Sequence, residues 1–257
     1  MPRSSEVAIV TGAGSGIGRA LARELSREPE LTVLAVGRQR GRLEETGATA
    51  VGEVVPVEAD VGTVEGRQRV QAVVQALGRV RFLVHAAGVF TIALLGEISL
   101  EAWREIAGAN VEGRLFLTQA LLRRFAPRAR VLFVGSRSAR RPRHGAGAYC
   151  ITMAASTMLA RCLQRELAGH DILVGTAVPG SVDTRILAAA LAADPAVFPD
   201  SLEYRREQAA GQLVAPAAVG RFFHWLLTSV TDQEFTAHEW ELEDQTHHHL
   251  WQRSSEG

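Results

Sequence analysis

The sequence contains no lysine, so all 28 residues counted as Lys and Arg are arginine. The 28 acidic residues balance them, and with a formal net charge of zero nothing favours a nucleic-acid partner. No hydrophobic run reaches the roughly 18 apolar residues that a membrane span requires. Membrane-spanning and polyanion-binding proteins are therefore disfavoured, and the expected partner is a small molecule.

Cysteine is scarce as well. Cys150 and Cys162 lie twelve positions apart in a segment with helical spacing, which separates them by about 18 Å along the axis. That distance is too long for a disulfide, so both are predicted to be core thiols. Residues 1–6 carry an arginine and a glutamate before a short apolar run, unlike a secretory segment, which favours a cytoplasmic location. The tail, residues 253–257, is predicted to fray.

Short β-branched runs alternate with helical patterns through the first two thirds of the chain. The predicted strands are 7–10, 32–36, 54–57, 82–86, 131–134 and 172–177, and the predicted helices are 17–26, 64–77, 100–125 and 148–168. This order is typical of a doubly wound parallel sheet with helices on both faces. We therefore expect a single α/β domain over residues 1–257, with ligands at the carboxyl ends of the strands.

The alternation of strand and helix patterns ends after residue 177. Residues 179–212 hold Asp-Pro and Pro-Asp turns and an alanine-rich helical stretch, a pattern that fits a lid over a pocket at about residues 181–212. A surface helical hairpin is the alternative. A helix over 216–227 and a last strand near 235–242 are predicted to close the sheet.

A glycine-rich turn, Thr11-Gly12-Ala13-Gly14-Ser15-Gly16-Ile17-Gly18, joins the first strand to the first helix. Glycine lets a backbone approach a pyrophosphate closely, and the helix N-terminus attracts its charge. Here the sequence resembles the short-chain dehydrogenase/reductase family. The resemblance implies a Rossmann-type fold and a dinucleotide held by this turn, through Gly12, Ser15, Gly16, Ile17 and Gly18.

The second strand ends in Gly37-Arg38, where an acidic residue would normally hold the ribose 2′-hydroxyl of NAD. Gly37 removes that acid, and Arg38 adds donors suited to a phosphate. The sequence therefore favours NADP as the cofactor. A solvated surface arginine is the alternative interpretation of Arg38.

Further matches to the family follow other strands. The resemblance implies an adenine contact at Asp60 and Val61, cofactor contacts at Ala87 and Gly88, and carboxamide contacts at Val182 and Thr184. His85 departs from the family's motif Asn-Asn-Ala-Gly. We expect it to be a structural hydrogen-bonding residue rather than a catalytic one.

The family's catalytic spacing is present. Ser136 follows the fifth strand, Tyr149 lies thirteen residues later, and Asn110 occupies the family's asparagine position. The resemblance implies that Ser136 binds the substrate carbonyl, that Tyr149 delivers a proton, and that NADPH delivers hydride.

The family's lysine is expected four residues after the tyrosine, where this chain has Met153. That lysine lowers the pKa of the tyrosine, which is near 10 when unassisted. No lysine elsewhere can replace it. Two hypotheses follow: a carbonyl reductase with weakened chemistry, in which Met153→Lys raises turnover, or a non-catalytic NADP-binding sensor or subunit.

Two other polar clusters are given no catalytic role. The arginines of the loop before Tyr149 (Arg137, Arg140, Arg141 and Arg143) are interpreted as a solvated face. The run from His247 to His249 is interpreted as a surface cluster without metal, because consecutive side chains point apart.

The segment after residue 197 indicates which class of substrate is reduced. Phe198-Pro199, Tyr204 and residues 211–216 are similar to the sepiapterin reductase and benzil reductase branch, which implies NADPH-dependent reduction of one carbonyl of a dicarbonyl. The family's long helices usually pair across a subunit interface, and residues 115–122 with 158–163 would suit that pairing. A homodimer or homotetramer is therefore expected.

Overall fold

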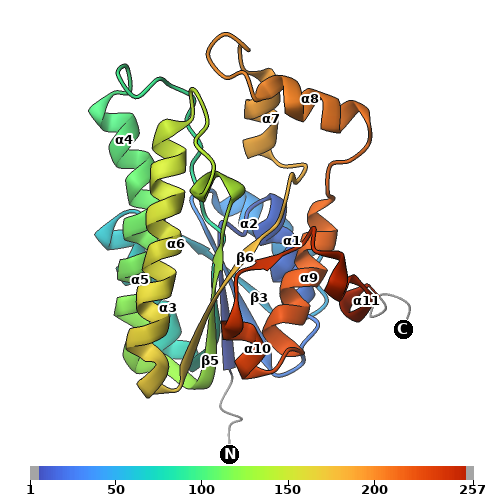
Figure 1. Ribbon diagram of the computed structural model, residues 1–257. Coiled ribbons are helices and arrows are strands. Elements are labelled where there is room, and N and C mark those ends of the chain that lie inside the picture. Colours follow the sequence, from blue (N-terminus) through green and yellow to red (C-terminus); the bar gives the residue numbers. More distant parts are fainter. Residues whose placement is uncertain (1–5, 253–257) are drawn as a thin grey trace, which may run out of the picture.

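The computed structural model describes residues 6–252, so the predicted frayed tail and nearly all of the N-terminal segment lie outside the described residues. Seven strands form one parallel sheet in the order β3-β2-β1-β4-β5-β6-β7. This confirms the predicted single doubly wound α/β domain (Figure 1). The strands are β1 (Glu6–Thr11), β2 (Leu31–Gly37), β3 (Val54–Glu58), β4 (Arg79–His85), β5 (Phe125–Val134), β6 (Ile172–Val178) and β7 (Trp240–Glu241).

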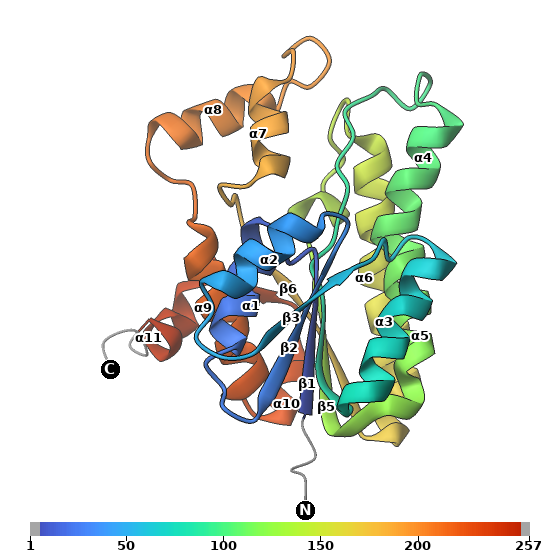
Figure 2. The same cartoon turned by 180° about the vertical axis from the view of Figure 1, so that it is seen from behind.

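Helices cover both faces of the sheet (Figures 1 and 2). One face carries α3 (Val64–Leu77), α5 (Gly113–Leu121) and α6 (Gly147–Leu167), and the other carries α1 (Gly16–Leu25), α2 (Arg40–Ala48) and α9 (Pro216–Thr228). Because both faces are buried, β1 is apolar along most of its length instead of alternating. The two apolar layers fix the sheet and leave its carboxyl edge free for a site.

The predicted helix over 100–125 is divided in the structure. It consists of α4 (Leu100–Ala107), a π-helical turn over Gly108–Glu112, and α5, and the chain then enters β5 at Phe125. The π turn carries Asn110, whose side chain accepts from the Val89 amide at 2.9 Å and donates to the Val89 carbonyl at 3.0 Å. These tertiary bonds accompany the break in helical geometry, which apolar periodicity does not reveal.

The C-terminal region differs from the predicted strand over 235–242. Residues Asp232–Ala237 form α10, and only Trp240–Glu241 pair with β6. Thr231 and Glu234 form a capping box that starts α10, a local signal that outweighs the β-branched and aromatic composition. A short helix, α11 (His248–Trp251), ends the described chain.

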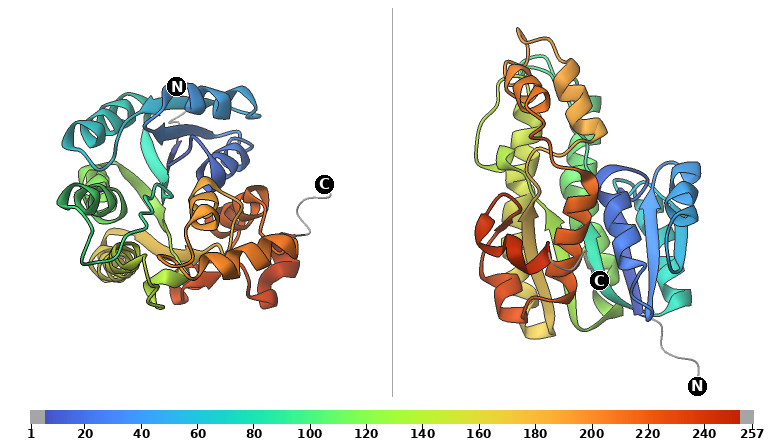
Figure 3. Two further views of the ribbon diagram at one scale, coloured as in Figure 1. Left: turned by 90° about the horizontal axis from the view of Figure 1, so that it is seen from above. Right: turned by 90° about the vertical axis from the view of Figure 1, so that its right-hand side faces the viewer.

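Residues 181–212 fold into α7 (Arg185–Ala192) and α8 (Ser201–Ala209), which project beyond the carboxyl ends of the strands (Figure 3). The base of this projection is joined by a bridge between Val182 and Val214, and the Asp183 amide donates to the Val214 carbonyl at 3.0 Å. The segment thus lies where a lid would lie. That it moves stays a prediction.

Two absences bear on the earlier expectations. Among residues 6–252, none of the helices could cross a membrane. Both cysteines are free, as expected, but Cys162 is exposed and Cys150 is only partly buried. The prediction of two core thiols is therefore wrong, because Cys162 faces solvent from α6.

Candidate active site

The glycine turn brings the start of α1 tightly against the end of β1. Gly12 has a φ of +70°, which favours glycine, and a Cβ built on Gly18 would lie 2.5 Å from the Gly12 carbonyl oxygen. Neither position has room for a larger residue without backbone movement. The N-terminus of α1 is therefore held at the carboxyl edge of the sheet, where its amides can face an anion.

The predicted cofactor residues converge on this edge. One groove is lined by residues from the ends of four strands and the start of α1: Gly12, Ser15, Gly16, Ile17, Gly18, Arg38, Asp60, Val61, Ala87 and Gly88. Thr184 borders both this groove and an adjoining pocket, and Val182 lines the pocket. The sequence separates these residues widely, and the parallel sheet brings them to one side.

Arginines gather at the end of the groove near Arg38. Arg185 donates to the Ser15 hydroxyl at 3.0 Å. Burial lowers the pKa of Arg185, and the charges of Arg42, Arg38 and Arg19 lower it further. Arg38 pairs with Glu105 at 2.9 Å, with both side chains about half exposed. This surplus of positive charge fits a phosphate group in addition to a pyrophosphate.

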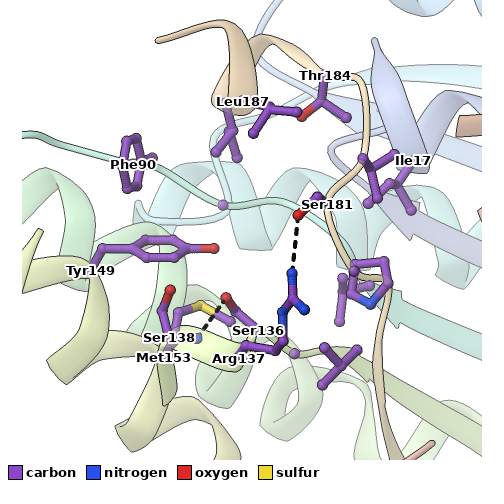
Figure 4. Close-up of a pocket in the computed structure, with 18 of the residues that line it drawn as sticks. Ile17, Phe90, Ser136, Arg137, Ser138, Tyr149, Met153, Ser181, Thr184 and Leu187 are labelled. Carbon is purple, nitrogen blue, oxygen red and sulfur yellow. Dashed lines mark hydrogen bonds between the residues drawn. The ribbon is translucent and has the colours of Figure 1, made fainter. Parts of the chain in front are cut away.

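The adjoining pocket holds the predicted serine and tyrosine (Figure 4). Ser136 follows β5, and Tyr149 stands in the first turn of α6, so both side chains reach the same cavity. The Tyr149 ring lies edge-on to Phe90, with centroids 5.0 Å apart. Burial raises the pKa of Tyr149, and a hydrogen bond with Ser136 opposes the rise. The phenol is therefore protonated at neutral pH.

Asn110 lies behind this pocket rather than in its lining. Its side chain is fully buried and donates to the Thr152 hydroxyl at 3.1 Å, in addition to the two bonds with Val89. Through Thr152 it contacts α6, and through Val89 it holds the loop after β4. Asn110 is placed to hold the two elements that frame the pocket.

The comparisons with known proteins agree with this geometry. The sequence profile of the family described as short chain dehydrogenase matches residues 6–194. The chain belongs to the short-chain dehydrogenase family. It is 35% identical over 192 residues to an uncharacterised short-chain type dehydrogenase/reductase of Sinorhizobium fredii. The aligned region covers 72% of this chain and 73% of that protein.

Two further similarities carry more specific descriptions. Meso-2,3-butanediol dehydrogenase of Serratia marcescens is 28% identical over 184 residues, covering 71% of this chain and 73% of the relative. The structure of L-sorbose reductase from Gluconobacter frateurii, complexed with NADPH and L-sorbose, superposes with a TM-score of 0.80. It is 25% identical and covers 93% of this chain and 95% of that one. The family and these relatives identify this short-chain dehydrogenase as an oxidoreductase.

One charged residue of the pocket was missed by the sequence analysis. Arg114, from the first turn of α5, lines the pocket together with Ser136, Tyr149 and Met153. Only 4% of Arg114 is exposed. The signal was available: an arginine stands four residues after Asn110, and so on the same face of a helix, directly before the apolar run Leu115-Phe116-Leu117. Its significance depends on where that face points.

His85 has the structural role expected of it. It is buried, its Nε2 atom lies 2.8 Å from the Thr118 hydroxyl, and its ring packs on Phe133. Burial lowers the pKa of His85 well below 6.5, and the charge of Arg114 lowers it further. The imidazole is therefore neutral in the folded protein throughout the mildly acidic range.

This neutral histidine predicts acid sensitivity. Below pH 6.5 the unfolded chain takes up a proton at His85 that the folded chain excludes, so stability falls as the pH falls. We expect the wild type to lose about 1.4 kcal/mol per pH unit more than His85→Asn in that window, until the folded pKa is reached. Urea denaturation of both proteins between pH 7 and pH 5 measures the difference, and parallel curves would contradict it.

Two expectations about surface clusters are wrong in part. Arg143 is buried instead of solvated, because it pairs with Asp200, the residue before α8, and donates to the Ser138 hydroxyl at 3.0 Å. His247 is buried too, since it bonds the Glu241 carbonyl at 2.9 Å and accepts from the Trp251 indole at 3.1 Å. Within residues 6–252, none of the His, Cys, Asp and Glu side chains group as a metal site.

Proposed function

We propose that this short-chain dehydrogenase is an NADPH-dependent carbonyl reductase in which Ser136 and Tyr149 act on the substrate. The observation that carries the proposal is the placement of these two hydroxyls. They line one pocket, which shares Gly88, Phe90 and Thr184 with the glycine-turn groove. A carbonyl in the pocket would thus face a dinucleotide in the groove.

The side chains of the pocket divide the work of the reaction. Ser136 donates a hydrogen bond that orients the carbonyl oxygen, and Tyr149 gives its phenolic proton to the same oxygen. Because the pKa of Tyr149 is raised, the acid form is available at neutral pH. Phe90 and Leu187 provide apolar walls that exclude water. NADPH, when bound, supplies the hydride that the carbonyl carbon accepts.

NADP is the cofactor that the groove favours. Gly37 leaves no carboxylate at the end of β2. The pKa of Arg185 is lowered first by burial and then by neighbouring arginines, whose positive charge a 2′-phosphate would offset. The related L-sorbose reductase structure contains NADPH. Arg38 is proposed as the main contact with that phosphate.

Removing Arg38 tests this assignment. Arg38→Ala should reduce the preference for NADP(H) over NAD(H) by about 1 to 3 kcal/mol, since a charge-assisted contact is lost. Glu105→Gln should act in the opposite direction, because it releases Arg38 from its ion pair. Titration of both cofactors against the three proteins provides the measurement. Equal affinities for the two cofactors in the wild type and in Arg38→Ala would contradict the proposal.

The proposed substrate class is a small ketone with a second oxygen on the adjacent carbon, such as a vicinal dicarbonyl. Its support is the resemblance of residues 198–216 to dicarbonyl reductases and the related meso-2,3-butanediol dehydrogenase, which acts on a vicinal diol. A panel of vicinal dicarbonyls, hydroxyketones and isolated ketones, followed by NADPH oxidation, tests the class. Turnover only of isolated ketones would exclude it, and turnover of none would refute the reductase.

The assembly is proposed to be a homodimer or homotetramer. Phe116 and Leu122 are exposed beside α5, and Ile151 and Met158 are exposed on α6, which packs on the same face of the sheet. These side chains lie within or near the two helical segments for which the sequence predicts pairing.

The cytoplasmic location stays a prediction.

A further inference from the structure

Arg114 is a buried cation without a carboxylate partner in the described part of the chain. Its Nη1 atom donates to the Val134 carbonyl at 2.9 Å and to the Ser156 hydroxyl at 2.8 Å, and its Nη2 atom donates to the Ala87 carbonyl at 3.2 Å. The Nε atom is buried with no hydrogen-bond partner. Three neutral acceptors hold the guanidinium in place while its charge stays uncompensated.

A buried charge of this kind is costly, so its retention calls for an explanation. Burial lowers the pKa of Arg114 to about 10, which leaves the side chain charged at neutral pH. Its three acceptors come from the loop after β4, from the end of β5 and from α6, so the guanidinium joins three elements at the pocket that it lines. A structural role alone could be served by neutral groups.

The pocket that contains Arg114 also contains Tyr149. Both residues line the same pocket, the arginine opposes the rise in the pKa of Tyr149, and an ionised Tyr149 would raise the pKa of Arg114 in turn. Among the other groups that influence this phenol, Cys150 raises its pKa and Arg143 lowers it, but the charge of Arg143 is balanced by Asp200. Arg114 is thus a positive charge in the lining of the same pocket that no ion pair among the described residues balances.

Arg114 also lies next to the position where the family resemblance places a lysine. Ser156, which accepts a hydrogen bond from Arg114, is three residues after Met153 and therefore on the same face of α6. Met153 is 2% exposed and lines the pocket. A second cation at position 153 would be buried close to the guanidinium and would be repelled by it. An apolar residue at this position avoids that repulsion.

We infer that Arg114, on α5, supplies the positive charge that the family resemblance assigns to a lysine at position 153 on α6. The cation thus comes from a different helix, and its electrostatic role is the same. The inference rests on the proposed function of Tyr149. When the phenolic O–H bond breaks and the proton joins the substrate oxygen, negative charge develops on the phenolate, and Arg114 stabilises it. Solvent then returns a proton to Tyr149. Arg114 is a positioning residue in this scheme, since it acts through Tyr149.

The chain offers a direct test because it has only two tyrosines, Tyr149 and Tyr204. Incorporation of 3-fluorotyrosine lowers the phenol pKa into a range where proteins stay folded, and fluorine-19 NMR then follows each ring separately. Tyr204→Phe identifies the signal of Tyr149. The pH of half-ionisation of Tyr149 should rise by about one unit or more in Arg114→Met, and stay near the wild-type value in Arg114→Lys.

A charge exchange completes the design. Arg114→Met/Met153→Lys moves the cation to the family position, and it should bring the half-ionisation of Tyr149 back toward the wild-type value. If Arg114→Met folds with an unchanged midpoint, the inference is wrong. The other two variants take the place of Arg114→Met if it does not fold. In that case the inference is overturned if the half-ionisation pH of Tyr149 in Arg114→Lys, or in Arg114→Met/Met153→Lys, lies about one unit or more above the wild-type value.

The titration is independent of turnover. If no carbonyl is reduced by any variant but the midpoints move as expected, the proposed function fails while the electrostatic coupling stands. If carbonyls are reduced and the midpoints do not move, the reductase stands and the role of Arg114 fails. The two results are therefore distinguishable.

Discussion

Replacing Tyr149 with phenylalanine should reduce NADPH-dependent carbonyl reduction by about 10²- to 10⁴-fold, the usual contribution of a positioned general acid. The ring and its edge-on contact with Phe90 are retained, and only the hydroxyl that faces Ser136 is lost. We therefore expect the fold and cofactor binding to survive. The measurement is steady-state turnover at saturating NADPH, together with the dissociation constant of NADPH from fluorescence titration.

Ser136→Ala is the matched control for this variant. It removes the oxygen that orients the carbonyl but leaves the proton donor in place, so its loss of turnover should be smaller. If Tyr149→Phe reduces a carbonyl as fast as the wild type, another group delivers the proton and the proposed mechanism is wrong. If Tyr149→Phe also loses NADPH binding, the change reports on the groove and not on acid catalysis.

Met153→Lys should lower the stability of the protein without raising its turnover. The sequence alone predicts higher turnover for this variant, because position 153 lacks the lysine of the family. In the structure that site is buried, and Arg114 lines the same pocket and bonds Ser156, three residues further along α6. A second buried positive charge is expected to reduce the free energy of unfolding by about 2 to 4 kcal/mol.

Met153→Leu controls for the change in shape, since an exchange of similar volume usually costs less than about 1.5 kcal/mol. Urea denaturation gives the stabilities, and NADPH oxidation with a carbonyl that the wild type reduces gives the turnover. A Met153→Lys protein that is as stable as the wild type and faster would show that the guanidinium does not reach this site. Recovery of stability in Arg114→Met/Met153→Lys would confirm that the two cations conflict.

These expectations also bear on the alternative of a non-catalytic NADP-binding sensor. That hypothesis depended on Met153 standing where the family has a lysine. Arg114 lines the pocket of Tyr149, and the positive charge that we infer it supplies means that Met153 by itself does not favour the sensor. Nothing in the family assignment favours the sensor either.

The sequence by itself determined strands β1 to β6, the glycine turn and the places of Ser136 and Tyr149 after β5 and at the start of α6. These features are local: a strand, turn or helix start leaves its pattern in consecutive residues, and parallel strands bring their carboxyl ends to one edge whatever lies between them. The capping box at Thr231 was equally local and was missed because the β-branched and aromatic residues around it were given more weight.

Only the tertiary structure decided the electrostatics of the pocket. Arg114 and Tyr149 line one pocket because α5 and α6 pack side by side on the sheet, and Arg143 is paired with Asp200, 57 residues away. Charge–charge interactions depend on separation in space and on the surrounding dielectric, and neither is encoded in residue spacing across different helices. The missing lysine was visible in the sequence, but the arginine that we infer replaces its charge became visible only when two helices were packed together.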